Sequence, residues 1–203
     1  MTTLNYILKK FNIAYNDKTP MPIEIPGVGR DELARILSES NFKSGVEIGI
    51  AAGEYSEILS KGNPQMKLFG VDPYIPHRGY HDITRTSTFE KNEKEAHEKL
   101  DKFPNYEFIK KFSMDAVKDF KDNSLDFVYI DANHDFQSVT NDIVEWSKKI
   151  KAGGIISGHD YYRHRNHENI HVYQVVNAIT DAYHIRPWFA LGADHPRSWM
   201  WIL

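Results

Sequence analysis

Cysteine is absent from this chain of 203 residues. Its absence excludes a disulfide framework, a thiol nucleophile and any zinc or iron–sulfur site built on cysteine. A protein without cysteine fits a reducing compartment, so we expect a cytoplasmic location. Long apolar runs are also missing: no stretch approaches the roughly 20 residues of a membrane span, and the first residues lack the apolar core and cleavage site of a signal peptide. We therefore expect no membrane partner.

An excess of basic charge is missing as well. Lysine and arginine together number 25 against 28 acidic residues, which gives a formal net charge of -3. Proteins that bind nucleic acid through its phosphates carry a basic field, so we do not expect nucleic acid as a partner. The 41% hydrophobic content, 12 Gly and 9 Pro are typical of a globular domain and exclude collagen-like, coiled-coil and wholly disordered chains.

The chain divides into an N-terminal segment and one domain. Residues 1–29 show little periodicity and contain Pro20, Pro22 and Pro26, which break helices. We interpret this segment as one that wraps the domain or helps cover its site. From Asp31 onward, apolar residues recur at helical spacing, so residues 30–203 are expected to form the domain.

Strand and helix patterns alternate along this domain. Apolar runs predict strands at 46–48, 66–71, 106–109, 125–130 and 155–157, and periodic segments between and after them predict helices at 54–59, 89–100, 115–120, 136–150 and 172–183. Such alternation predicts a doubly wound, Rossmann-like α/β fold with a mostly parallel sheet and helices on both faces. Residues 184–191 and 198–203, joined by a turn, predict a C-terminal antiparallel hairpin. The tryptophans of this hairpin would pack the core or a dimer surface, so a homodimer stays open.

A glycine-containing turn follows the first predicted strand of the domain. The dinucleotide fingerprint needs glycine at positions 49, 51 and 54, but Ala51 and Glu54 occupy two of them, and a carboxylate at 54 repels pyrophosphate. A ligand with a positive end suits the turn better, because Glu47 and Glu54 would face an ammonium or sulfonium group. Gly49 permits close approach of the ligand to the backbone. S-adenosylmethionine is a ligand of this kind.

Two further strand ends carry polar residues suited to a nucleoside. Asp72, followed by Pro73, closes the second strand, where an acid can accept hydrogen bonds from both ribose hydroxyls. After the third strand, Ser113, Met114 and Asp115 would meet the adenine.

With the acidic glycine loop, Asp72 and Asp115 in this order, residues 40–203 resemble the class I S-adenosylmethionine-dependent methyltransferases. The resemblance implies methyl transfer. It also implies a cofactor site that runs from the methionine end to the ribose and the adenine, formed by Glu47, Gly49, Ala51, Gly53, Asp72, Pro73, Ser113, Met114, Asp115 and Asp131.

Acidic residues also follow the fourth and fifth strands. Asp131 and Asp160 should meet at the same edge of the sheet, and two neighbouring carboxylates raise each other's pKa unless a cation lies between them. Magnesium is the natural cation for such oxygen ligands. The alternative is that both acids cap the segments that follow them and that His134 faces solvent.

The Asp-x-x-His run at 131–134 and the Gly-Gly-x-x-x-x-His-Asp-Tyr run at 153–161 resemble metal-dependent O-methyltransferases that act on sugar hydroxyls of macrolides and related glycosides. This resemblance implies that Asp131 and Asp160 bind a divalent metal, Mg or Mn, and that His134 is the catalytic base. The third ligand is open: His159 would favour manganese, iron or zinc, or water would complete the shell. The expected acceptor is a small hydroxylated molecule such as a sugar.

Two other functions stay open at this point. One is an NAD-dependent oxidoreductase on a similar fold, which Ala51 and Glu54 disfavour. The other is a non-catalytic protein that binds a nucleoside. The polar and aromatic loop at 161–167 is expected to overlook the site, and residues 75–88 are long enough to form a lid.

Overall fold

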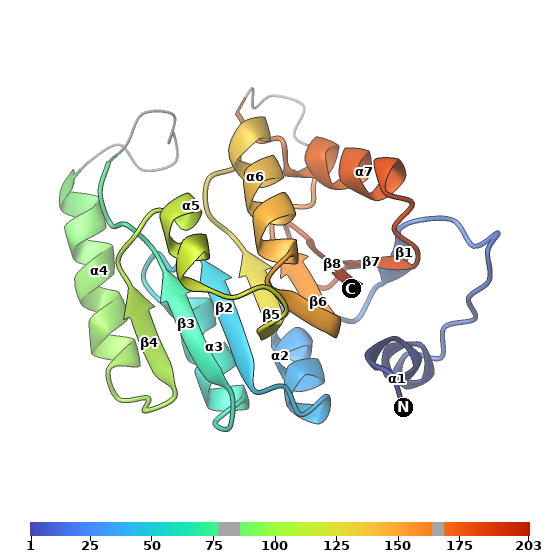
Figure 1. The fold of residues 1–203 in the computed structure, drawn as a ribbon, viewed down its shortest axis with the longest axis horizontal. Helices are drawn as coiled ribbons and strands as arrows, with labels where there is room; N and C mark the ends of the chain where they lie inside the picture. Colours follow the sequence, from blue (N-terminus) through green and yellow to red (C-terminus); the bar gives the residue numbers. More distant parts are fainter. Residues whose placement is uncertain (77–85, 164–168) are drawn as a thin grey trace.

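The computed structural model describes residues 1–76, 86–163 and 169–203, and these ranges contain one mixed sheet (Figure 1). Its strands are β1 (Ile23–Ile25), β2 (Ser44–Ile48), β3 (Lys67–Val71), β4 (Tyr106–Ile109), β5 (Leu125–Ile130), β6 (Ile150–Gly158), β7 (Trp188–Leu191) and β8 (Ser198–Ile202). They lie in the order β1-β7-β8-β6-β5-β2-β3-β4. β8 runs antiparallel to β6 and β7, and the remaining pairs are parallel. The predicted doubly wound sheet and C-terminal hairpin are confirmed.

Helices cover both faces of the sheet and enclose two apolar cores. The helices are α1 (Thr3–Lys10), α2 (Arg30–Glu39), α3 (Glu54–Gly62), α4 (Thr86–Leu100), α5 (Ser113–Ala116), α6 (Phe136–Ser147) and α7 (Val172–Ala182), with a 3₁₀ turn at Val117–Asp119. Residues such as Leu33, Leu59 and Leu100 pack α2, α3 and α4 onto one face. Ile143 and Val175 pack α6 and α7 onto the other, so that α6 lies in front of the sheet and α3 behind it in Figure 1.

The register of the central strands brings their carboxyl ends to one edge. Ile48 of β2 pairs with Val71 of β3 and with Ile130 of β5, and Ile130 pairs in turn with Gly158 of β6. The residues that directly follow these strands therefore meet. In doubly wound sheets this edge is where ligands bind.

The N-terminal segment contains regular structure that the sequence analysis missed. Thr2 caps α1 by accepting a hydrogen bond from the backbone of Asn5 (3.2 Å), and Ile7 is fully buried in the core. β1 extends the sheet by pairing in parallel with β7. The prediction of a segment without a helix was wrong because an eight-residue helix shows too few turns for its periodicity to stand out.

α1 lies away from the carboxyl edge of the sheet. The Thr3 hydroxyl donates to the carbonyl of Gly153, which lies at the start of β6, and Lys10 pairs with Glu32 and Glu39 of α2. The helix therefore closes the amino-terminal end of the sheet. That the N-terminal segment helps to cover the site stays a prediction.

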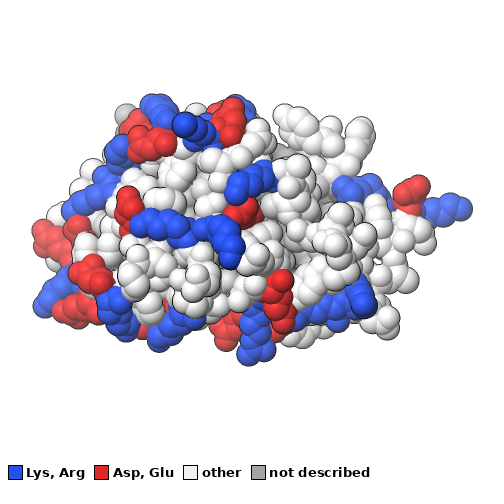
Figure 2. Space-filling view, turned by 60° about the horizontal axis from the view of Figure 1, so that its bottom comes forward, with Lys and Arg blue, Asp and Glu red and all other residues white. Residues whose placement is uncertain are grey.

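The tryptophans of the hairpin lie inside this chain. Trp188, Trp199 and Trp201 are at most 2% exposed, so they pack the core. Homodimer formation stays a prediction. On the face drawn in Figure 2, positive and negative side chains intermingle. Across the described ranges, no helix combines the length and apolar character that crossing a membrane requires.

Replacing Ile7 with alanine tests whether α1 belongs to the folded core. Deleting a fully buried isoleucine costs about 2–5 kcal/mol through lost transfer energy and the cavity left behind. We expect the Ile7→Ala variant to lose that much free energy of unfolding in urea denaturation. Ile58→Ala on α3 is the control, because Ile58 is 38% exposed and its truncation should cost much less. Equal losses in the two variants would contradict the placement of α1.

Candidate functional site: a nucleoside-sized pocket beside an Asp–His cluster

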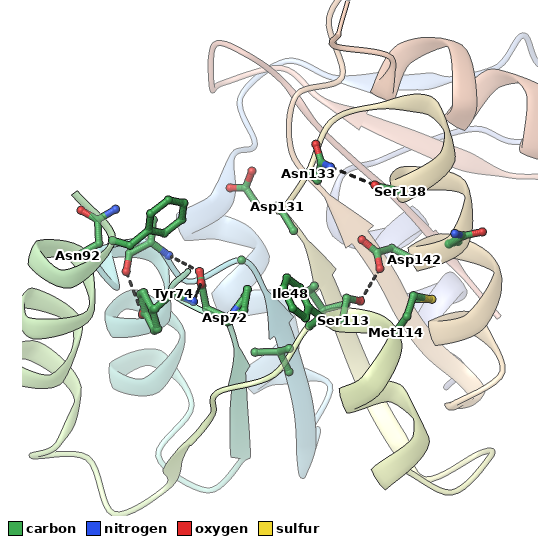
Figure 3. A pocket seen from close by; sticks show the side chains of 18 residues that line it. Ile48, Asp72, Tyr74, Asn92, Ser113, Met114, Asp131, Asn133, Ser138 and Asp142 are labelled. Carbon is green, nitrogen blue, oxygen red and sulfur yellow. Dashed lines mark hydrogen bonds between the residues drawn. The ribbon is translucent and has the colours of Figure 1, made fainter. Parts of the chain in front are cut away.

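A pocket of about 200 Å³ opens at the carboxyl edge of the sheet (Figure 3). It lies between the loop after β2, the end of β3 and the helices α4, α5 and α6. The predicted residues on its wall are Gly49, Ala51, Asp72, Pro73, Ser113, Met114 and Asp131. The sequence analysis missed the other wall residues, which include Tyr74, Phe89, Asn92, Asn133, Ser138, Asn141 and Asp142.

Gly49 allows the loop after β2 to pass directly against the end of β5. Its φ is +87°, and a Cβ atom added there would lie 2.1 Å from the carbonyl oxygen of Asp131. No side chain fits in that space, so any other residue would push the two strand ends apart. This contact fixes Asp131 beside the glycine loop.

Asp72 is held rigidly at the end of β3. Its carboxylate accepts backbone hydrogen bonds from Ile50 (3.0 Å), Ala51 (3.2 Å) and Tyr74 (2.9 Å). Burial raises the pKa of Asp72, and the three backbone donors oppose this shift. A carboxylate offers about four lone-pair sites, so about one remains for a ribose hydroxyl.

The adenine end predicted from the sequence is only partly on the pocket wall. Ser113 and Met114 line it, whereas Asp115 is exposed and pairs with Lys118 at 2.8 Å. The acid on the wall is Asp142 of α6, which accepts a hydrogen bond from the Ser113 hydroxyl.

Asp142 is 4% exposed, and burial raises its pKa to about 7. The indole of Trp146 donates to the Ser113 hydroxyl oxygen (2.8 Å), so Trp146, Ser113 and Asp142 form a hydrogen-bonded chain. Asp142 lies on the same helix face as Val139, Ile143 and Trp146. An acid within an apolar stripe was the signal in the sequence that could have revealed it.

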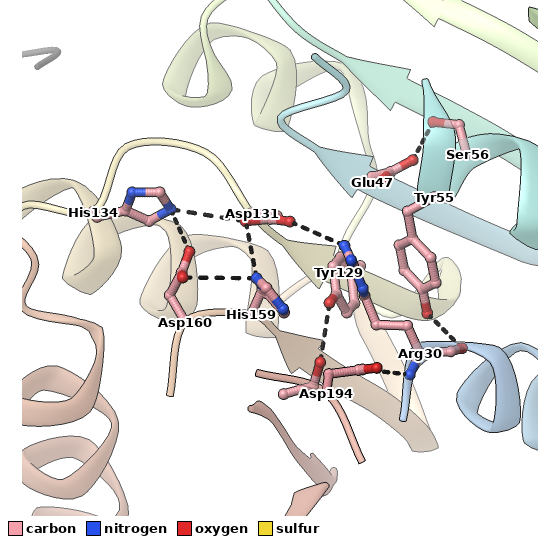
Figure 4. Close-up of polar contacts among 11 residues, drawn as sticks. Arg30, Glu47, Tyr55, Ser56, Tyr129, Asp131, His134, His159, Asp160 and Asp194 are labelled. Atoms are coloured by element: carbon pink, nitrogen blue, oxygen red, sulfur yellow. Dashed lines mark hydrogen bonds and ion pairs between the residues drawn. The ribbon is translucent and has the colours of Figure 1, made fainter. Parts of the chain in front are cut away.

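Three residues of the predicted glycine loop lie away from the pocket wall. Glu47 is 2% exposed and accepts a hydrogen bond from Ser56 behind the loop (Figure 4). Glu54 points outward and pairs with Lys99 at 2.7 Å. A Cβ at Gly53 would meet Leu100 at 2.9 Å, so this glycine permits α3 to pack against α4. The structure therefore does not bring these residues to the cavity.

Burial raises the pKa of Glu47 to about 8, although the hydrogen bond from Ser56 and the charge of Arg30 act in the opposite direction. Glu47 is thus protonated at neutral pH. A neutral carboxyl cannot balance an ammonium or sulfonium group, so the predicted role of Glu47 beside the positive end of a ligand has no support in this structure.

Asp131, His134 and Asp160 converge next to the pocket (Figure 4). His134 Nε2 lies 2.8 Å from one oxygen of Asp160 and 3.7 Å from Asp131. His159 Nδ1 lies 3.9 Å from Asp131 and 3.7 Å from Asp160. Since Asp131 also lines the pocket, the cluster and the cavity share a wall.

Asp160 has an unusual backbone conformation, with φ of +58°. Non-glycine residues in this region are uncommon and cluster at functional sites. Burial alone would raise the pKa of Asp160, but the contacts with His134 and His159 outweigh it and lower this pKa. Burial would lower the pKa of His159, but the neighbouring carboxylates of Asp160 and Asp131 raise it.

The alternative of two capping acids and a solvent-facing histidine does not describe this arrangement. The N-cap of α6 is Asp135, which accepts from the backbone of Gln137 (2.9 Å) and Ser138 (3.1 Å). The side chain of His134 is 18% exposed and turns toward Asp160.

The cluster fits a divalent metal ion. One atom each from Asp131, His134 and Asp160 lie within 4.8 Å of one another, which gives two oxygens and one nitrogen. This donor set suits manganese, iron or zinc better than magnesium, which prefers oxygen. Within the described ranges, His159 Nε2 is buried without a hydrogen-bond partner, so His159 is a fourth candidate ligand.

Most of the two predicted covering loops lies outside the described residues. Positions 77–85 of the proposed lid and 164–168 of the loop after β6 are in those gaps.

A family model described as a methyltransferase domain matches residues 46–161, which include both the glycine loop and the Asp–His cluster. The chain belongs to this methyltransferase family. The resemblance to S-adenosylmethionine-dependent methyltransferases is thereby confirmed. The assignment covers β2 to β6, the part of the chain that forms the pocket.

A curated relative is an uncharacterised protein of Acanthamoeba polyphaga mimivirus, 27% identical over 124 residues. The match spans 59% of this chain and 52% of that protein, so this chain covers about half the length of that relative.

Solved structures share the fold at low identity. An O-methyltransferase from Bacillus cereus, in complex with S-adenosylhomocysteine, is 16% identical with a TM-score of 0.60 over 99% of this chain and 90% of that one. A caffeoyl-CoA O-methyltransferase candidate from Staphylococcus aureus is 15% identical, with a TM-score of 0.58 over 97% and 89%. The N-methyltransferase NodS from Bradyrhizobium japonicum is also 15% identical, with a TM-score of 0.54 over 84% and 91%.

A Glu47→Gln variant tests the buried, protonated state of Glu47. The folded protein keeps the Glu47 proton up to about pH 8, whereas the unfolded chain releases it near pH 4.3. Between these values the native state binds more protons, so its stability falls as pH rises, by at most about 1.4 kcal/mol per pH unit. Glutamine keeps an acceptor for Ser56 without titrating.

The measurement is urea denaturation of both proteins from pH 5 to 9. We expect the stability of the variant, relative to the unmodified protein, to increase up to about pH 8 and then level off. A difference that does not change with pH would contradict a buried, protonated Glu47.

Proposed function

We propose that this protein transfers the methyl group of S-adenosylmethionine to a hydroxyl of a small acceptor such as a sugar, with help from a divalent metal ion. The observation that carries the proposal is that Asp131 belongs both to the wall of the nucleoside-sized pocket and to the Asp–His cluster. A methyl group presented by a cofactor in the pocket would therefore lie beside groups that take up a proton.

The pocket supplies partners for a nucleoside. Asp72 is placed to accept a ribose hydroxyl, and the Ser113–Asp142 pair faces the far end of the cavity, where an adenine would lie. Met114 adds an apolar surface there. The relative from Bacillus cereus holds S-adenosylhomocysteine on the same fold, which supports the choice of cofactor.

The Asp–His cluster favours oxygen over nitrogen as the methyl acceptor. The fold itself does not decide, because both O- and N-methyltransferases share it. A neutral amine already carries a free lone pair, whereas an alcohol must lose its proton as it attacks. His134, oriented by Asp160 at 2.8 Å, is a base suited to take that proton near neutral pH.

The methyl transfer itself demands mainly positioning. S-adenosylmethionine already contains an activated methyl group, so the protein has to align the acceptor oxygen with the methyl carbon and the sulfur. Asp131 and Asp160, with His159, would hold a metal ion, which stabilises a developing alkoxide when it is bound, leaving His134 to act as the base.

A His134→Ala variant tests the role of this histidine in the proton transfer. Removing a general base typically lowers turnover by about 10²- to 10⁴-fold. We expect such a loss, with the affinity for S-adenosylmethionine changed less than about 2-fold, because His134 turns toward Asp160 and would act on the acceptor and not on the cofactor. The assay follows transfer of labelled methyl groups to a panel of hydroxylated acceptors. His97→Ala is the control, since His97 lies on α4 outside the pocket wall, where it pairs with Asp101 and stacks on Phe108.

Equal turnover in the two variants would overturn the role of His134. Comparable loss of turnover and cofactor binding would instead show that His134 supports the pocket.

Removal of divalent metals tests the cation at the cluster. If Asp131 and Asp160 hold an ion that stabilises the alkoxide, exhaustive chelation should lower turnover at least about 10-fold, and added Mn²⁺ should restore it. Asp160→Asn should then need a higher Mn²⁺ concentration for half-maximal activity, because it removes a charged ligand. Unchanged turnover after chelation would exclude a metal-assisted reaction and leave His134 and Asp160 to act alone.

A further inference from the structure

Arg30, the first residue of α2, is fixed at the edge of the proposed site. Its backbone N–H donates to Asp194 in the loop between β7 and β8 (2.7 Å), and its carbonyl accepts from the hydroxyl of Tyr55 on α3 (3.3 Å). Two segments distant in the sequence therefore hold this residue in place. The sequence analysis missed it, because Arg30 follows a run of proline and glycine and belongs to no motif.

The side chain of Arg30 extends toward Asp131 of the Asp–His cluster (Figure 4). Its guanidinium lies 5.4 Å from the centre of the Tyr55 ring, and one nitrogen lies 3.9 Å from Asp131. The Tyr55 ring supports the guanidinium from one side. The side chain remains 36% exposed, so a ligand can reach it.

The hydrogen-bonding capacity of this guanidinium is unused within the described part of the chain. A separation of 3.9 Å from Asp131 is an ion pair without a hydrogen bond. Arginine presents its N–H groups as a rigid fork that matches a carboxylate. The geometry thus offers a carboxylate-binding group at the edge of the loop.

The charges around the glycine loop favour one kind of ligand for the Arg30 guanidinium. A methionine moiety carries an ammonium and a carboxylate, and a carboxylate beside Asp131 would be repelled unless a cation compensated it. Lys99, a second cation at this loop, is already bound to the carbonyl of Ala52 and to Glu54, both at 2.7 Å. Among the described residues at this edge, the guanidinium of Arg30 has no hydrogen bond and can offer two parallel N–H donors to a carboxylate.

We propose that Arg30 binds the α-carboxylate of the methionine moiety of the cofactor, with Asp131 facing the ammonium of the same moiety. This inference rests on the proposed use of S-adenosylmethionine. With Asp72 at the ribose and Arg30 at the opposite end of the loop, the cofactor is held at both ends, and its methyl group is fixed next to Asp131.

The test compares two ligands that differ in the amino-acid group. S-adenosylhomocysteine carries the carboxylate, whereas 5′-methylthioadenosine has the same nucleoside and a thioether without it. Both are titrated calorimetrically into the unmodified protein and into Arg30→Met, Arg30→Lys and Arg35→Ala. Methionine keeps much of the apolar stem over Tyr55. Arg35, on the same helix, is 72% exposed and pairs with Glu32, so it is the matched control.

We expect Arg30→Met to weaken S-adenosylhomocysteine at least about 10-fold and 5′-methylthioadenosine less than about 2-fold. Arg30→Lys should weaken S-adenosylhomocysteine by an intermediate factor, because lysine keeps the charge but loses the fork. Arg35→Ala should change neither affinity. The ratio of the two affinities is measured on the same protein, so a partial loss of folded protein does not alter it.

Three results would overturn the inference. An unchanged affinity of Arg30→Met for S-adenosylhomocysteine would remove Arg30 from the cofactor site while the proposed cofactor stands. Equal weakening of both ligands would show that Arg30 only supports the fold of the loop. Failure of the unmodified protein to bind either ligand would overturn the proposed cofactor itself, and this inference with it.

Discussion

The contact between Gly49 and the backbone of Asp131 is the constraint on which the site depends. Parallel pairing of β2 with β5 brings the ends of these strands together, and the absence of a side chain at position 49 lets them touch. The Asp131 backbone N–H donates to the carbonyl of Ile48 at 2.8 Å, which holds the two ends in register. Because of this contact, the wall of the pocket and the Asp–His cluster form one continuous surface.

The electrostatics of the carboxyl edge follow from how each acid is paired. Within the described residues, Glu47 is buried with Ser56 as its hydrogen-bond partner, so it keeps its proton, whereas Asp160 is paired with two histidines, which lower its pKa. The two carboxyl groups thus take opposite protonation states. Negative charge lies at Asp160, beside the proposed path of the methyl group, and none lies at Glu47.

The sequence predicted the central sheet well, because long apolar runs and strand–helix alternation are strong signals. It also predicted that Asp72 and Asp131 reach one edge, since parallel strands end together. It placed Asp115 at the adenine end of the pocket, where Asp142 lies instead, because only packing decides which side of the short helix α5 faces a cavity. Arg30 was equally hidden, because its role depends on contacts with Asp194 and Tyr55, which are distant in the sequence.

The most direct test of the central claim is calorimetric titration of the purified protein with S-adenosylmethionine, with NAD under the same conditions as the comparison. The pocket geometry predicts saturable binding of S-adenosylmethionine and no binding of NAD, because the glycine loop lacks the residues that accommodate a pyrophosphate. A clear NAD isotherm, with no heat from S-adenosylmethionine, would contradict the assignment of the pocket.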